Sequence, residues 1–132
     1  RQMCIRDSDN IVPIHYLMEQ TDPNYVFLEM DIFWTTAAGQ DPKSLLAQYP
    51  KRYKLMHIKD MIPNDLVINE QEGFRSLYSF FRQVTSCGSG SIDIKPIVSK
   101  ALDVGVEHFF VEHDMCRNPK VDLLDSARFL LT

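Results

Sequence analysis

Three apolar segments, each followed by a helical pattern, place the strongest constraint on the fold of this 132-residue chain. They are rich in β-favouring residues and read YVFLEMDIF at 25–33, YKLMHI at 53–58 and HFFVE at 108–112. Nearly continuous apolar sequence is typical of strands in a parallel sheet that is covered on both faces. Regular alternation of strands and helices predicts right-handed crossovers, so we expect an α/β fold. Either an open doubly wound sheet or part of a (β/α)8 barrel fits this order.

The expected helices are recognised by their ends as much as by their apolar spacing. Asp41 is a suitable N-cap with Pro42 in the first helical position, and Gly105 is a suitable stop for the helix before it. The last expected helix has a stripe of Leu123, Leu124, Ala127 and Leu130, which predicts its buried side. The predicted helices cover 13–20, 41–49, 92–104 and 122–131, with a further one at 76–84 inside a long connection over 60–91.

Composition excludes several classes of function. The chain is 45% hydrophobic and 24% charged, as in globular domains, and its net charge of −4 gives no basic face for nucleic acid. No apolar run approaches the roughly 18 residues of a membrane span, so we expect neither a nucleic-acid nor a membrane partner. The cysteines Cys4, Cys87 and Cys116 lack CxxC or CxxH spacing, which predicts neither a disulfide framework nor a thiolate zinc site. No glycine-rich nucleotide-binding motif follows any strand.

The first eight residues, RQMCIRDS, have no periodic or turn-like pattern. The stretch at 2–8 resembles the in-frame translation of a common transposon-based sequencing adapter. We therefore expect 1–8 to be a non-native scar and exclude it from the fold. On this interpretation 9–132 begins inside a longer gene, an export signal would not be visible, and localisation stays open, with the cytoplasm as the default.

Polar residues stand where each predicted strand ends: Asp31, His57 and Glu112. The carboxyl ends of barrel strands line the active site, and polar groups are costly beside buried strands. Two carboxylates and an imidazole suit Mn²⁺, Mg²⁺, Co²⁺ or Zn²⁺, so we predict a divalent-metal site. In the alternative interpretation Asp31 caps a helix, His57 is a satisfied core histidine and Glu112 forms a salt bridge.

Five motifs then occur in order along 9–132: FLEMDIFW at 27–34, DPKSLL at 41–46, KRYKLMHIKDM at 51–61, GSGSIDI at 88–94 and FFVEHD at 109–114. Together they resemble the C-terminal part of the xylose-isomerase-like sugar phosphate isomerase/epimerase family of TIM barrels. The resemblance implies that the three strands are the sixth to eighth of the barrel. It also implies that Asp31, His57 and Glu112 are three of four ligands of one divalent metal, the fourth being a glutamate on a strand before residue 9.

The resemblance further implies the activity of the longer protein. Such enzymes isomerise or epimerise a small-molecule sugar or sugar phosphate by moving a proton alpha to a carbonyl through an enediolate. Glu112 matches one of the two glutamates of that mechanism, so we expect it to be both a ligand and the catalytic acid/base. Its partner glutamate lies outside this chain, and we expect the fragment alone to be inactive. A homo-oligomer is left open.

Three further residues are candidates for substrate binding. Lys59 follows the metal histidine and could contact substrate oxygens or balance negative charge. Trp34 could form an apolar wall against a sugar ring, or belong to the core. Gly90, in the turn Gly88–Ser91, could offer its N–H to a hydroxyl or phosphate, or simply lead into a helix. His113 is expected to be structural because strand alternation turns it away from Glu112, and Arg52 is expected to form a stabilising ion pair.

Other functions on this scaffold compete with the isomerase. An apurinic-site endonuclease would need a histidine where Trp34 stands and an Asp-x-His pair, which the chain lacks. A dehydratase acting on a sugar acid or an inosose would use the same metal, and nothing in 9–132 separates it from an isomerase. A non-catalytic sugar-binding barrel is disfavoured by the intact set of Asp31, His57 and Glu112.

Overall fold

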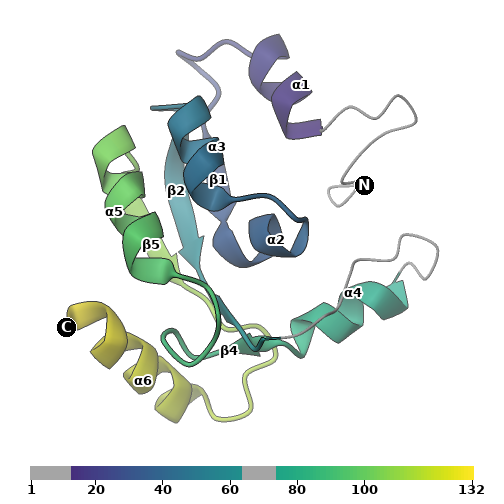
Figure 1. The fold of residues 1–132 in the computed structure, drawn as a ribbon, viewed down its shortest axis with the longest axis vertical. Helices are drawn as coiled ribbons and strands as arrows, with labels where there is room; N and C mark the ends of the chain where they lie inside the picture. Colours follow the sequence, from purple (N-terminus) through teal and green to yellow (C-terminus); the bar gives the residue numbers. More distant parts are fainter. Residues whose placement is uncertain (1–12, 64–73) are drawn as a thin grey trace.

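The computed structural model describes residues 13–63 and 74–132, so the proposed scar at 1–8 lies outside the described residues. Figure 1 shows helices arranged around a small parallel sheet, with a further short strand pair near its carboxyl end. The elements in chain order are α1 (Pro13–Gln20), β1 (Leu28–Asp31), α2 (Ile32–Ala37), α3 (Pro42–Gln48), β2 (Tyr53–Ile58), β3 (Asp60–Met61), α4 (Phe74–Phe81), β4 (Val84–Thr85), α5 (Ile94–Val104), β5 (His108–Val111) and α6 (Pro119–Leu131).

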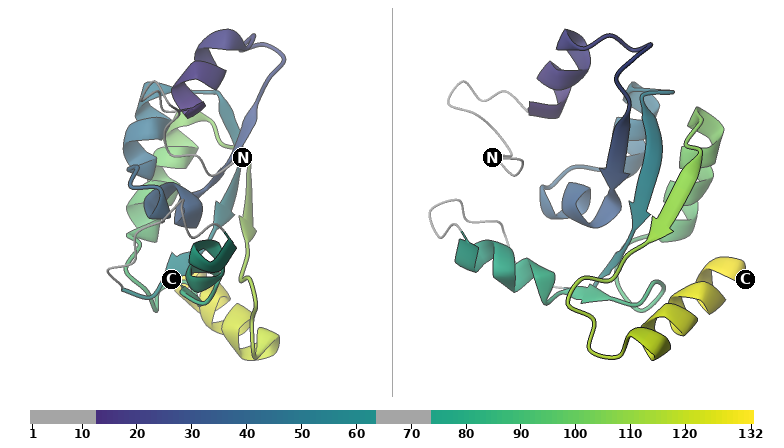
Figure 2. Two further views of the ribbon diagram at one scale, coloured as in Figure 1. Left: turned by 90° about the vertical axis from the view of Figure 1, so that its right-hand side faces the viewer. Right: turned by 180° about the vertical axis from the view of Figure 1, so that it is seen from behind.

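The main sheet is parallel, as the strand–helix alternation predicted. Its order is β1-β2-β5, and Asp31 pairs with His57 while His57 pairs with Phe110 in the register. The carboxyl ends of the strands therefore meet at one edge. The helices α2, α3 and α5 lie on one side of this sheet in the edge-on view of Figure 2. On the other side Phe110, at 48% exposed, is not covered by any part of the chain that the structure describes.

The first strand is shorter than the expected 25–33, which is a correction. β1 ends at Asp31 because the Asp31 side chain accepts a hydrogen bond from the Trp34 backbone N–H at 3.0 Å and so begins α2. Ile32 and Phe33, predicted as strand, are helical and fully buried. Their apolar character came from burial and not from strand geometry.

The connection after β2 contains a second correction. The short strands β3 and β4 pair antiparallel, with Asp60 opposite Thr85 and Met61 opposite Val84. The helix expected at 76–84 is present as Phe74–Phe81 and ends earlier because Val84 joins this pair. Part of the connection, 64–73, lies outside the described residues.

The predicted helix ends at Asp41 and Gly105 are present in the structure, but the predicted buried face of α6 is partly exposed. Asp41 accepts from the N–H groups at the start of α3, and Gly105 ends α5 with a φ of 93°, which is the left-handed region that favours glycine. By contrast, Leu123 and Leu124 on α6 remain 49% and 48% exposed, because no described element lies against that side. Ala127 is exposed as well, whereas Leu130 of the predicted stripe packs against the core together with Phe129, and Ser126 is buried.

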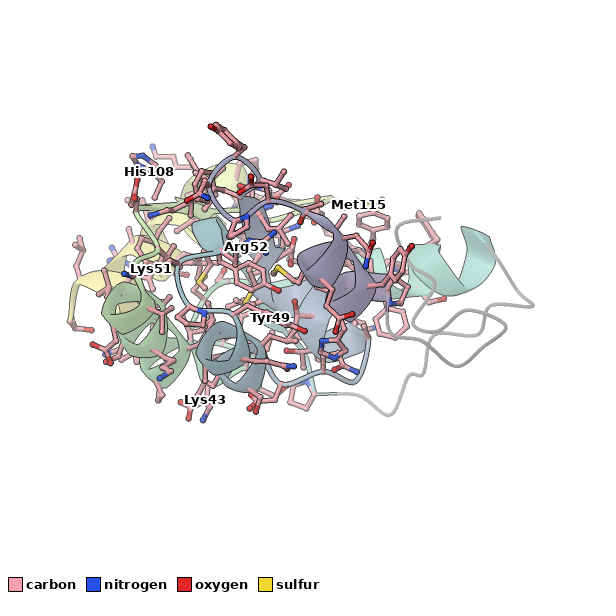
Figure 3. The ribbon with its side chains drawn as sticks, turned by 90° about the horizontal axis from the view of Figure 1, so that it is seen from above. Lys43, Tyr49, Lys51, Arg52, His108 and Met115 are labelled. Atoms are coloured by element: carbon pink, nitrogen blue, oxygen red, sulfur yellow. The ribbon has the colours of Figure 1, made fainter. Side chains whose placement is uncertain are left out.

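Arg52 corrects another expectation, since within the described residues its contacts are hydrogen bonds and not an ion pair. It donates to Met18 O at 2.9 Å, to Val26 O at 3.3 Å and to Thr21 Oγ1 at 2.6 Å. The guanidinium thus ties α1 and the turn after it to the start of β2, at the end of the sheet seen from above in Figure 3. In the two described stretches no helix has both the length and the apolar character needed to cross a bilayer.

Candidate metal centre

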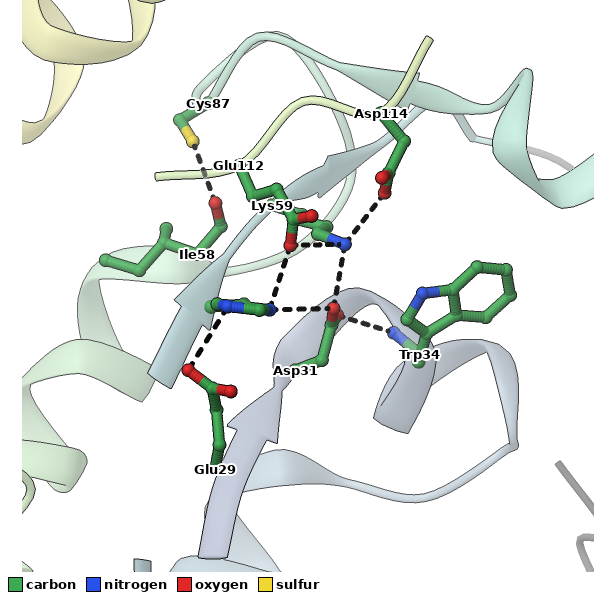
Figure 4. A network of polar contacts seen from close by, with 9 residues as sticks. Glu29, Asp31, Trp34, Ile58, Lys59, Cys87, Glu112 and Asp114 are labelled. Atoms are coloured by element: carbon green, nitrogen blue, oxygen red, sulfur yellow. Dashed lines mark hydrogen bonds and ion pairs between the residues drawn. The ribbon is translucent and has the colours of Figure 1, made fainter. Parts of the chain in front are cut away.

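The structure brings together the three residues that the sequence placed at the strand ends. One potential ligand atom from each of Asp31, His57 and Glu112 lies within 4.8 Å of the other two. His57 Nδ1 is 2.8 Å from Glu112 Oε2 and 3.6 Å from Asp31 Oδ2 (Figure 4). The parallel register explains this meeting, because Asp31 and His57 are register partners and Glu112 follows β5 directly.

The second ring nitrogen of His57 has its own carboxylate partner, which sequence reasoning missed. Nε2 lies 3.1 Å from Glu29 Oε1. Metal-binding histidines commonly donate their other N–H to a carboxylate, which fixes the tautomer and the ring orientation. Glu29 stands two residues before Asp31 on β1, and side chains two apart share a face of a strand. That alternation was the signal by which Glu29 could have been found.

Lys59 lies at the centre of the network, and its side chain is only 3% exposed. Its ammonium contacts three carboxylates, at 2.9 Å from Asp31 Oδ2, 2.8 Å from Glu112 Oε2 and 2.7 Å from Asp114 Oδ2. Burial alone would lower the pKa of Lys59, but the hydrogen bonds to Asp114, Glu112 and Asp31 outweigh it and raise that pKa above its usual value. Lys59 is therefore a permanent cation within the site, and contact with substrate stays a prediction.

The charges of the network favour a further cation. The carboxylates of Glu29, Asp31, Glu112 and Asp114 surround His57 and the single permanent cation, Lys59. Helix capping by Asp31 Oδ1 and the Lys59 contacts of Glu112 also match the alternative, non-metal interpretation. That interpretation leaves the excess negative charge unexplained, whereas a divalent cation would offset most of it. The oxygen and nitrogen donors fit Mn²⁺, Mg²⁺, Co²⁺ or Zn²⁺.

Trp34 lies at the rim of this network, in the first turn of α2. Its backbone N–H donates to Asp31, and its half-buried ring packs edge-on against Phe33 and Phe81 and at a tilt against Phe80. The ring therefore contributes to the core, and a contact with a sugar ring stays a prediction.

The turn containing Gly90 has an internal partner. The N–H groups of Gly88 and Gly90 both donate to Asp60 Oδ2 at 2.9 Å, while those of Met61 and Ile92 donate to Oδ1 at 2.8 and 3.0 Å. Asp60 is fully buried. A β-carbon at position 90 would lie 2.3 Å from Asp60 Oδ1, so only glycine fits there. The N–H of Gly90 is thus already bonded, and a substrate contact at this residue stays a prediction.

The chain is similar in sequence to several known proteins. No family model matches the chain. It is 39% identical over 95 residues to an inosose dehydratase of Geobacillus kaustophilus and 35% identical over 119 residues to one of Clostridium tetani. Those alignments cover 69% and 87% of this chain.

Solved structures carry the same fold. A sugar phosphate isomerase/epimerase from Parabacteroides distasonis superposes with a TM-score of 0.67 at 25% identity, over 94% of this chain and 37% of that one. A second structure of that description, from the same organism, gives a TM-score of 0.68 over the whole chain and 40% of its own length, at 21% identity. The sequence is thus similar to inosose dehydratases, and the fold is similar to sugar phosphate isomerases/epimerases.

The fold of the chain is accordingly that of part of a TIM barrel, as predicted. The chain spans 30% and 40% of the length of the two curated relatives named above. Its parallel strands present Asp31, His57 and Glu112 at the edge where barrels of this architecture place their active sites.

Proposed function

We propose that 9–132 is the C-terminal part of a divalent-metal-dependent sugar or sugar phosphate isomerase or epimerase, called the parent protein below. One observation supports this most strongly: Asp31, His57 and Glu112 converge within 4.8 Å at the carboxyl edge of the sheet. The excess of carboxylates around them and the related sugar-processing proteins support the same conclusion. The substrate class is a small-molecule sugar or sugar phosphate.

In this proposal the cation is held by an oxygen of Asp31, by His57 Nδ1 and by an oxygen of Glu112. A fourth ligand, the glutamate that the family resemblance implies, would lie outside 9–132. A bound divalent cation supplies Lewis acidity, which polarises carbonyl and hydroxyl oxygens of the sugar. Glu29 keeps the Nε2 proton of His57 in place, so that Nδ1 presents its lone pair.

Glu112 carries the proton-transfer role. Its side chain is 40% exposed and lies beyond the end of β5, so one oxygen can face a substrate while Oε2 contacts His57 and Lys59. The carboxylate takes the proton alpha to the carbonyl, leaving an enediolate, and can return it to the neighbouring carbon on the same face. Return of a proton to the opposite face falls to the partner glutamate that the resemblance implies outside this chain. Lys59 is less suited to act as the base, because its hydrogen bonds to carboxylates raise its pKa and favour the protonated form.

A dehydratase is the second candidate, and the curated relatives favour it because they are named inosose dehydratases. Its first step is the same proton removal alpha to a carbonyl. The electron pair then expels the β-hydroxyl, which leaves as water after protonation. The two candidates therefore share Glu112 as base and differ only in the fate of the enediolate.

The test uses the parent protein with Mn²⁺ and a panel of ketoses, aldoses and inososes in D₂O. An isomerase or epimerase incorporates solvent deuterium without losing atoms, whereas a dehydratase product has lost one water by mass spectrometry. Glu112→Gln should abolish either reaction, while Glu107→Gln, which removes an exposed carboxylate paired with Lys54, should leave it intact. Undiminished turnover in Glu112→Gln would overturn the proton-transfer role. Sugar binding without exchange or elimination would support a non-catalytic barrel instead.

A further inference from the structure

A second cluster of metal-ligating side chains lies in the segment that joins β5 to α6 and in the first turn of α6. It consists of His113, Cys116 and Asp122, and one potential ligand atom from each lies within 4.8 Å of the others. None of these residues belongs to the network around His57. We propose that the cluster is a second cation site, selective for a zinc-class divalent ion.

The contacts within the cluster leave one group without a partner. Cys116 Sγ donates to Asp122 Oδ2 at 2.8 Å, so thiol and carboxylate already face each other. His113 Nδ1 is buried and has no hydrogen-bond partner among the described residues. A buried ring nitrogen with no partner is energetically costly, and a bound cation would satisfy it.

The donor set distinguishes this site from the first one. An imidazole nitrogen, a thiol sulfur and a carboxylate oxygen are together the ligands of Zn²⁺, while the thiol is poorly suited to Mg²⁺ or Mn²⁺. On binding, the Cys116 S–H bond breaks, its proton leaves to solvent, and the thiolate sulfur forms the bond to the cation. Three protein ligands leave one position for water.

The backbone between the ligands shapes the site. Met115 has a φ of 51°, an uncommon left-handed conformation for a residue with a side chain, and it lies between His113 and Cys116. This turn brings the two side chains of an H-x2-C sequence toward the same point. This H-x2-C spacing differs from the CxxC and CxxH spacings typical of thiolate zinc sites.

Further hydrogen bonds connect the cluster to the rest of the fold. Asp122 Oδ1 accepts from Ser86 Oγ at 3.3 Å, and Ser126 Oγ donates to Asp122 O at 2.8 Å while accepting from Cys87 N at 3.0 Å. A cation here would join the start of α6 to the loop that carries Glu112. When bound, the cation would therefore hold that loop against α6.

The experiment uses the 132-residue chain with Cys4→Ser and Cys87→Ser, which leaves Cys116 as its only thiol. Titration with Co²⁺, a spectroscopic substitute for Zn²⁺, should give a thiolate-to-cobalt charge-transfer band that Cys116→Ser removes. His113→Ala and Asp122→Asn should each weaken Co²⁺ binding at least about tenfold, as expected for loss of one ligand. The exposed residues His108 and Asp103 provide matched controls, and His108→Ala and Asp103→Asn should leave the band unchanged.

The result is separable from the proposed function. His57→Ala removes a ligand of the first site and should leave the charge-transfer band intact. Absence of the band, or a band of equal affinity in His113→Ala and Asp122→Asn, would overturn the proposal. A second measurement uses the unsubstituted chain and so does not depend on whether the variants fold. Zn²⁺ should protect Cys116 from alkylation more than it protects Cys87, and equal protection would count against the site.

Discussion

Near the end of β2, the Asp60 carboxylate and the pair of carboxylates Asp31 and Glu112 are held by different kinds of partner. Asp60 is fully buried and receives four backbone N–H groups, so its oxygens have no capacity left for a ligand. Asp31 and Glu112 are partly exposed and are held chiefly by two side chains, the Lys59 ammonium and the His57 imidazole. Backbone donors cannot be redistributed without moving the chain, whereas side-chain partners can give way to a cation. Of the two, only Asp31 and Glu112 are therefore suited to binding a cation.

The largest expected effect comes from breaking the Asp60 group in the parent protein. Asp60→Ala removes a fully buried carboxylate and leaves four backbone N–H groups without their acceptor. Each such group costs about 1–3 kcal/mol where water does not replace the acceptor, so we expect a loss of about 4 kcal/mol in the free energy of unfolding. Urea denaturation measures this loss, which should be the same with and without Mn²⁺. A change below about 1 kcal/mol would show that water replaces the carboxylate.

Removing Lys59 should give the next largest effect, and one that depends on metal. Lys59→Met leaves Asp31, Glu112 and Asp114 without their shared cation, which costs about 3–5 kcal/mol for a broken buried ion pair. Thermal unfolding in EDTA should show the full loss, and Mn²⁺ should recover part of it by neutralising Asp31 and Glu112. Lys54→Met, which removes a more exposed lysine, is the control. An identical loss in both conditions would argue against a cation between those carboxylates.

Glu29 tests the orientation of the His57 ring. We expect Glu29→Ala to weaken Mn²⁺ binding about 10–100-fold, because such carboxylate partners fix the tautomer of a ligating histidine. Isothermal titration calorimetry of the parent protein measures this, with Glu107→Ala as the control. Unchanged affinity would show that the 3.1 Å contact between His57 Nε2 and Glu29 has no part in holding the metal.

Replacing Asp41 should give the smallest loss of unfolding free energy. Like Asp60, Asp41 accepts hydrogen bonds from backbone N–H groups, but its carboxylate is exposed to water. Asp41→Ala should cost about 1 kcal/mol, as for loss of an N-cap. The hydrogen bond from the Ser44 hydroxyl is the main cause that lowers the pKa of Asp41 in the folded state. Its stabilisation is therefore present above the unfolded-state pKa and is lost as pH falls through the lower, folded-state pKa.

Denaturation at about pH 6 and again at about pH 2.5, on either side of the usual aspartate pKa, checks this sign. The difference in the free energy of unfolding between the unsubstituted protein and the Asp41→Ala variant should shrink at the lower pH. A difference of constant size would mean that the Asp41 charge contributes nothing to the cap.

Most of what places the candidate metal centre was visible in the sequence. Apolar segments that end in Asp31, His57 and Glu112 predict parallel strands whose polar ends meet, and the structure has this arrangement. Glu29 was missed although period-two alternation indicates it. The metal itself, and the roles of Lys59, Trp34 and Gly90 toward a substrate, remain predictions.

Other features depend on contacts between distant parts of the chain, which local patterns do not encode. Asp60 receives N–H groups from residues 28–32 positions away, and β3 pairs with β4 across the long connection. Ile32 and Phe33 appeared strand-like because burial selects the same residue types in helices and strands. The prediction that Leu123 and Leu124 of α6 are buried was wrong, because no element that the structure describes packs against them.

The contact between Gly90 and Asp60 also constrains how sequences of this kind can change over time. A β-carbon at position 90 would meet Asp60 Oδ1 at 2.3 Å and Met61 O at 2.4 Å. Shortening Asp60 would relieve the first clash but not the second, which involves the backbone. Position 90 therefore excludes a side chain whether or not Asp60 is replaced first. Replacing Asp60 removes the acceptor of the four N–H groups that hold the turn. A single replacement at position 90 therefore requires the turn to shift relative to Met61.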